Sequence, residues 1–72
     1  MAERGAKSRM ALLRGRLEET AGAITAARTG FDQTADPDLM EYYLYEVNAL
    51  RARHAYLFRQ LREQWSQEGD SK

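Results

Sequence analysis

The residues that could perform acid–base chemistry are few. Two pairs of carboxylates occur, Glu18 with Glu19 and Asp36 with Asp38. Paired carboxylates act as general acid and base where an apolar surrounding raises the pKa of one of them. Asp36 and Asp38 flank Pro37 and are explained by helix capping, whereas Glu18 and Glu19 fall on a solvated helix face. We therefore expect no catalytic residues and no enzyme activity.

Ligands for a metal ion or a cofactor are also scarce. The chain has no cysteine, one histidine and five dispersed glycines, so one chain lacks a thiolate site, a multi-histidine site and a glycine-rich phosphate loop. His54 falls on an apolar seam, where we interpret it as a buried or half-buried residue that fixes register. The alternative is a pH-sensitive interface or a metal site shared between chains. We predict no cofactor and no small-molecule substrate.

Arginine and tyrosine supply the remaining binding chemistry. Nine arginines against two lysines suit bidentate contacts to carboxylates or phosphates. The candidate anion or nucleic-acid contacts are Arg14, Arg16, Arg51, Arg53, Arg59 and Arg62. Ion pairs between residues four apart on a helix, such as Arg14 with Glu18 and Arg59 with Glu63, also explain such residues. Neighbouring tyrosines offer either a stacking surface for bases or helix packing.

The strongest helix signal begins at Asp36. Its carboxylate can cap a helix, Pro37 suits the first helical position, and Asp38 places negative charge at the positive end of the helix dipole. No glycine or proline follows until after Trp65, so we predict a helix over about residues 37–66, with frayed residues beyond it. Apolar spacings of three and four alternate along it, as in a coiled coil. This seam is Met40, Tyr43, Val47, Leu50, His54, Leu57 and Leu61.

The other predicted helix covers about residues 8–33, after a frayed N-terminal segment. Its seam has the same spacing and contains Met10, Leu13, Leu17, Thr20, Ile24, Ala27 and Phe31. Gly15 and Gly22 fall nearly opposite the seam, which indicates a solvent face or, alternatively, a small-residue stripe that another helix approaches. Gly30 is a candidate C-cap, although Phe31 continues the seam.

The two helices are joined by a short turn over residues 34–36. Because such a link makes neighbouring helices antiparallel, the sequence predicts one all-α domain, an antiparallel two-helix hairpin of coiled-coil type. A core of 72 residues without disulfides or metal seldom stabilises itself. We therefore expect self-association, most simply as a dimer that completes a four-helix bundle, or docking on a protein partner.

The second helix offers more apolar surface than one partner helix covers. The residues predicted to form a protein interface are Tyr43, Leu44, Val47, Leu50, Leu57, Phe58, Leu61 and Trp65. This surplus predicts a non-enzymatic helical interaction module. A weaker stripe of Tyr42, Ala49 and Tyr56 lies beside it.

Charge is segregated along the chain although its sum is zero. Residues 1–16 and 47–62 each carry a net charge of +4, residues 17–46 carry −6 and residues 63–72 carry −2. In a hairpin the two basic stretches lie side by side. They could meet the acidic turn of a second hairpin in an antiparallel dimer. The alternative function is a nucleic-acid-binding accessory protein whose arginines face a phosphate backbone.

The chain contains no apolar run long enough to span a bilayer, so we expect no membrane association. Its basic N-terminal residues are not followed by the continuous apolar stretch of a secretory signal. The expected location is therefore cytoplasmic.

Two motifs point to a known family. They are Asp36-Pro37-Asp38-Leu39 and Tyr45-Glu46-Val47-Asn48-Ala49-Leu50. The stretch from Ile24 to Glu63 resembles the YaaL-like family of short proteins from Gram-positive, often spore-forming bacteria. The resemblance implies a bacterial cytoplasmic setting and a gene neighbourhood linked to recombination or sporulation. The family has no established activity, so the resemblance assigns no catalytic residues.

Overall fold

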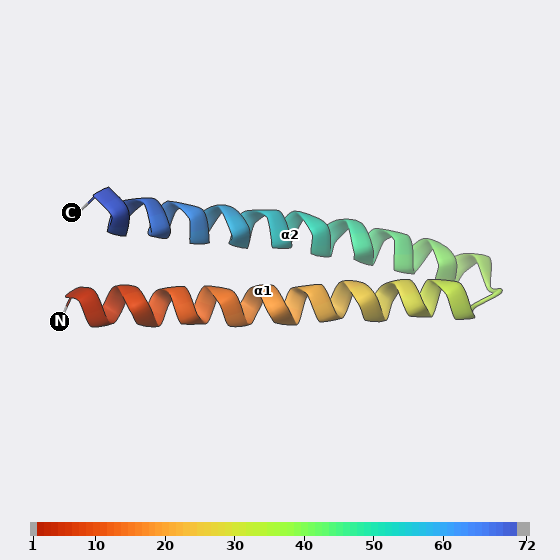
Figure 1. The fold of residues 1–72 in the computed structure, drawn as a ribbon. Helices are drawn as coiled ribbons and strands as arrows, with labels where there is room; N and C mark the ends of the chain where they lie inside the picture. The colour runs from red at the N-terminus through yellow and green to blue at the C-terminus, as the bar shows by residue number, and fades with distance from the viewer. Residues whose placement is uncertain (1, 71–72) are drawn as a thin grey trace.

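The computed structural model describes residues 2–70, and the side chains of residues 8–67 within them. Its two elements are helix α1, Ala2–Gln33, and helix α2, Pro37–Asp70. The helices lie side by side and antiparallel, with the first residue of α1 and the last residue of α2 at one end of a rod and the turn at the other (Figure 1). The rod measures 54 × 15 × 12 Å. The predicted all-α helical hairpin is confirmed.

The turn is held by short-range hydrogen bonds. The backbone N–H of Asp36 donates to Oγ1 of Thr34 at 3.1 Å. Oδ1 of Asp36 accepts from the N–H of Asp38 at 2.9 Å, and the carbonyl of Asp36 accepts from the N–H of Met40 at 2.9 Å. Asp36 is thus the N-cap of α2, as predicted, and Pro37 opens the helix where no N–H is needed.

The outer ends of both helices differ from the prediction. Helix α1 begins at Ala2 rather than near residue 8, and α2 continues to Asp70 rather than ending near residue 66. The segments predicted to fray contain alanine, glutamate, arginine, lysine and glutamine, which are good helix formers, and no proline interrupts them. One glycine in each segment was not enough to end a long helix that already packs on its neighbour.

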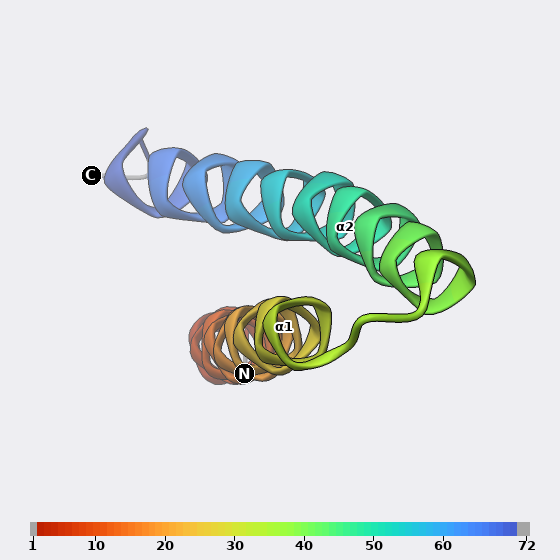
Figure 2. The same ribbon diagram turned by 90° about the vertical axis from the view of Figure 1, so that its right-hand side faces the viewer.

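The core is a single thin layer between the helices. Within residues 8–67 the buried side chains are Met10, Thr20, Ala27 and Leu57, and the other seam positions are half-buried. The hydroxyl of Thr20 donates to the carbonyl of Arg16 at 2.7 Å, so this buried polar group is satisfied within its own helix. Figure 2 looks along the rod and shows α2 inclined to α1, as expected for a seam with a coiled-coil period.

Gly30 has a packing role rather than the capping role considered from sequence. The helix continues through it to Gln33, and no described glycine has a positive φ. A Cβ atom at Gly30 would lie 2.6 Å from Cε1 of Tyr43. Gly30 therefore leaves the space that the Tyr43 ring occupies. A Cβ at Gly15 or Gly22 would meet no atom within 4 Å, so in the hairpin both lie on an open face.

Among the described helices, none combines the length and the apolar character that crossing a membrane requires.

Candidate functional site

We call the seams through which α1 and α2 pack on each other the inner seams. Helix α2 carries a second seam beside its inner seam. Its positions alternate spacings of four and three, and every one of them is exposed. We call this set the outer seam of α2, and it consists of Leu44, Asn48, Arg51, Ala55, Phe58, Arg62 and Trp65. Its large apolar members are Leu44, Phe58 and Trp65, with exposed fractions of 53%, 49% and 64%. Because they are separated by 14 and by 7 residues, which are whole heptads, they lie along one side of the helix.

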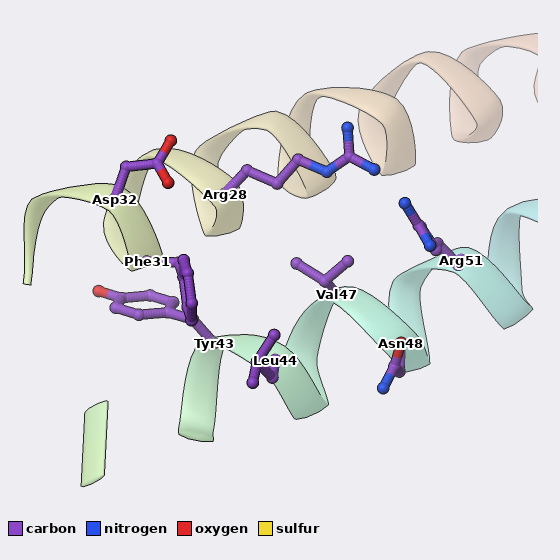
Figure 3. A pocket seen from close by; sticks show the side chains of 8 residues that line it. All are labelled: Arg28, Phe31, Asp32, Tyr43, Leu44, Val47, Asn48 and Arg51. Atoms are coloured by element: carbon purple, nitrogen blue, oxygen red, sulfur yellow. The ribbon is translucent and has the colours of Figure 1, made fainter. Parts of the chain in front are cut away.

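A groove opens on the same side of the hairpin, near the turn. It has a volume of about 280 Å³ and is lined by Arg28, Phe31, Asp32, Tyr43, Leu44, Val47, Asn48 and Arg51. Figure 3 shows Val47 reaching from α2 toward α1, with the rings of Phe31 and Tyr43 on one side of it. We call it the turn-end groove. Its apolar floor with polar margins is typical of a binding surface.

Arginine gives the turn-end groove a positive margin. Figure 3 shows the side chains of Arg28 on α1 and Arg51 on α2 extending toward the same end of it. Asp32 is the one carboxylate in the lining. Among the side chains of residues 8–67, no arginine donates a hydrogen bond. The guanidinium groups of Arg28 and Arg51 therefore remain available to a carboxylate or an aromatic face.

Two shallower hollows continue this side of the hairpin toward the chain ends. One, of about 190 Å³, is lined by Ala21, Ile24, Arg51 and His54. The other, of about 220 Å³, is lined by Phe58, Leu61, Arg62, Trp65 and Ser66. Arg51 belongs to both the first hollow and the turn-end groove. The turn-end groove, these two hollows and the outer seam of α2 therefore form one continuous face along most of the rod. We call it the grooved face.

The predicted interface residues separate into two groups. Leu57 is 4% exposed, and Tyr43, Val47, Leu50 and Leu61 are half-buried, so these five pack mainly within the hairpin. The other three, Leu44, Phe58 and Trp65, belong to the outer seam. The sequence joined the groups because both fall within one broad arc of α2. The structure shows that α1 already covers the part of that arc that carries Tyr43, Val47, Leu50, Leu57 and Leu61.

The six candidate arginines do not gather on one surface. Arg51 and Arg62 lie on the grooved face, and Arg14 occupies the matching position on α1. Arg16 and Arg53 occupy heptad positions on the opposite side of the inner seam. Arg59 lies outward on α2, with its Cζ atom 5.9 Å from the centroid of the Tyr56 ring. The antiparallel fold brings the basic stretches to the same part of the rod, but their side chains point to several sides.

The opposite side of α2 carries tyrosines that already have partners in the chain. The hydroxyl of Tyr42 donates to Oε2 of Glu46 at 2.9 Å. This hydrogen bond, together with the negative charge of Glu46, raises the pKa of Tyr42 above its ordinary value. The rings of Tyr42 and Tyr43 meet edge to face with centroids 5.2 Å apart, and Arg59 covers Tyr56. The weaker stripe predicted here is therefore partly satisfied by its own chain.

Sequence reasoning missed several members of the grooved face, among them Arg28 and Ala21 on α1. Arg28 was counted within the acidic stretch and Ala21 was not considered, yet both line hollows with residues of α2. The sequence nevertheless contains a signal for Arg28 and Ala21. Each directly follows an inner-seam residue of α1, just as Leu44 and Phe58 directly follow inner-seam residues of α2. In an antiparallel pair these places face each other across the seam.

His54 lies half-buried on the inner seam of α2, as the sequence suggested, and lines the hollow in the middle of the rod. Among the described residues, no three histidine, aspartate or glutamate side chains come together in a way that could hold a metal ion. The role of His54 in register remains a prediction.

Comparison with protein families, curated proteins and solved structures found no match to this chain. The resemblance to the YaaL-like family therefore stays a prediction, and the site must be interpreted from its own residues.

Proposed function

We propose that this protein is a non-enzymatic helical interaction module that self-associates through the grooved face. Two hairpins stacked face to face make a four-helix bundle, in which the outer seams become part of a second core. The observation that carries the proposal is the outer seam of α2, where Leu44, Phe58 and Trp65 stand exposed at heptad spacing beside an apolar groove.

The exposed area of the chain supports an oligomer. A compact monomer of 8.3 kDa exposes about 4,600 Å², whereas this chain exposes 5794 Å². The excess, about 1,200 Å², is more than the roughly 800 Å² that each partner contributes to a stable interface. Covering one long face of the rod would remove an area of this size. The separate hairpin thus exposes an additional area about as large as the surface that a stable dimer would bury on each chain.

The thin inner core supports the same conclusion. No described side chain is fully buried. Each helix has one neighbour, so burial of apolar surface by a single hairpin is small against the entropy lost when more than sixty residues are ordered. Burying Phe58 and Trp65 would add about 1.5–3 kcal/mol each. Self-association supplies stability that the hairpin lacks.

A matched pair of substitutions tests the proposal. Phe58 and Tyr56 are two residues apart on α2 and similarly exposed, at 49% and 53%, but only Phe58 lies on the grooved face. We expect Phe58→Ala to weaken self-association by about 30-fold or more, as for an aromatic residue at the centre of an interface. Tyr56→Ala should change it little. Light scattering over a concentration series measures both, and equal behaviour of the two variants would contradict the proposal.

Binding to nucleic acid is the alternative that the arginines raised. A strand lying along the grooved face would contact Arg14, Arg51 and Arg62 but not Arg53 on the other side. We therefore expect little binding of DNA or RNA even at low salt. Tight binding that weakens steeply with salt, and that is lost on replacing Arg59 and Arg62 with glutamine, would favour the alternative.

A further inference from the structure

The grooved face has a knob and a hole that suit each other. Trp65 is 64% exposed and lies near the open end of the rod, five residues before the last residue of α2. Leu44, at the turn-end groove, lies seven residues after the first residue of α2. At about 1.5 Å per residue these positions are about 7.5 Å and 10.5 Å from opposite ends of the helix. Two rods of this kind that overlap fully and run in opposite directions bring Trp65 of each to the groove of the other.

Building on the proposed self-association, we propose that the occupant of the grooved face is a second copy of this chain, stacked antiparallel about a two-fold axis at Ala55. In this dimer the Trp65 indole of each copy fills the turn-end groove of the other, against Leu44 and Val47. The guanidinium groups of Arg28 and Arg51 lie at the margin of that groove, where they can meet the π face of the indole. Tryptophan and arginine are the residues most enriched at the energetic centres of interfaces.

The spacing of the outer seam of α2 agrees with an axis at this level. Ala55 lies at, or within half a residue of, the midpoint of three pairs, which are Leu44 with Trp65, Asn48 with Arg62, and Arg51 with Phe58. A two-fold axis there places Leu44 on the partner's Trp65 and Arg51 on the partner's Phe58. Each contact occurs twice, as a self-complementary interface requires. At the axis itself stands alanine, which is small enough for two copies to approach closely.

Helix α1 agrees with the same axis independently. Arg14 and Glu18 are exposed on the grooved face and are centred on residue 16, about 26 Å from the turn end of α1. Ala55 is about 27 Å from the turn end of α2. An axis at this level therefore sets Arg14 against the partner's Glu18 and Ala11 against the partner's Ala21. Each positive charge of this pair thus meets a negative charge, and small residues meet small residues.

Charge excludes the parallel arrangement. In a parallel dimer the two-fold axis runs along the rod, so each charged stretch would lie level with the same stretch of the other chain. The stretches of +4 would then meet each other at one end, and the acidic turns of residues 17–46 would meet at the other. Like charges at close range oppose association. The antiparallel arrangement places the two acidic turns at opposite ends of the dimer.

The opposite face of the hairpin is a weaker candidate for the second copy. Its exposed aromatic residues include Tyr42 and Tyr56, which already engage Glu46 and Arg59. Burying them against another chain would break or desolvate these contacts. On the grooved face Phe58 and Trp65 have no such partner among the described side chains, so their burial costs less.

Cysteine cross-linking tests the axis directly, because the chain has no cysteine of its own. In the variant Ala55→Cys the two thiols lie across the axis and should form an interchain disulfide under mild oxidation. The control is Ala49→Cys, also an exposed alanine, which shares a heptad position with Tyr42 and Tyr56 on the other side of α2. A third variant, Arg51→Cys, detects an axis one helical turn nearer the hairpin turn. We expect the covalent dimer to form at least tenfold faster with Ala55→Cys than with either other variant.

Each outcome has a separate meaning when sedimentation is measured beside it. Fast cross-linking of Ala55→Cys in a dimer supports the proposed arrangement. A dimer in which Ala55→Cys reacts no faster than Ala49→Cys, or in which Arg51→Cys reacts fastest, overturns the arrangement and leaves the proposed self-association standing. A chain that stays monomeric overturns both.

Discussion

At the scale of single residues, two glycines of α1 have different roles. A Cβ at Gly22 meets open space, whereas one at Gly30 meets the Tyr43 ring. We expect Gly22→Ala to stabilise the fold by about 0.5–1 kcal/mol, since alanine is the better helix former. Gly30→Ala should destabilise it by about 1 kcal/mol, because displacing the ring outweighs that gain. Urea unfolding followed by circular dichroism measures both, and equal stabilisation would show that Tyr43 does not occupy the space at Gly30.

Tyr42 provides a pH test at the same scale. Its hydroxyl donates to Glu46, and the hydrogen bond and the negative charge of Glu46 raise the pKa of Tyr42. The folded state thus holds the phenolic proton more tightly than the unfolded state. The resulting stabilisation is present below the unfolded pKa and is lost as pH rises through the folded pKa.

We expect Glu46→Gln to lower the pKa of Tyr42 toward the ordinary tyrosine value, because the charge is removed while a hydrogen-bond acceptor remains. An NMR titration of the tyrosine ring follows this group directly. An unchanged midpoint in the variant would show that Glu46 is not its partner.

At the scale of the elements, the start of α2 depends on one carboxylate. Asp36 Oδ1 accepts from the N–H of Asp38 at 2.9 Å, and losing such a cap costs about 0.5–2 kcal/mol. We expect Asp36→Ala to lower the free energy of unfolding by about 1 kcal/mol. The control, Asp32→Ala, removes an equal charge near the end of α1 and should cause no loss. Equal effects of the two variants would mean that charge, rather than capping, matters at the turn.

The elements were also the part that the sequence predicted best. Asp36-Pro37 and the inner seams carry local signals, so the turn, the antiparallel pairing and the half-buried place of His54 followed from residue types and spacing. The outer ends did not, because helix propensity there outweighs a single glycine. The grooved face was only partly predicted. Recognising Arg28 and Ala21 on it requires the register between the helices, which depends on packing such as that of Tyr43 over Gly30.

At the scale of the whole molecule, stability should depend on protein concentration. If part of the core forms only between chains, dilution shifts the equilibrium toward the less stable separate hairpin. We expect the melting temperature to rise steadily over a hundredfold increase in concentration, and to rise less for Phe58→Ala. A melting temperature that does not change with concentration would indicate that the hairpin is stable alone.

The single tryptophan reports the same association. Trp65 is exposed in the separate hairpin and is proposed to enter a groove in the dimer. Its emission should therefore move to shorter wavelength, and its quenching by iodide should decrease, as concentration rises. Leu44→Glu, which places a charge in the groove, should abolish both changes. If the wild-type emission does not vary with concentration, Trp65 is not part of the interface.

The measurement that tests the central claim most directly is sedimentation equilibrium of the unmodified chain across a wide range of concentrations. The proposed function predicts a species of twice the chain mass of 8.3 kDa, which dissociates to the single chain only on dilution. A protein that sediments at 8.3 kDa throughout, while circular dichroism shows it fully helical, would contradict self-association through the grooved face.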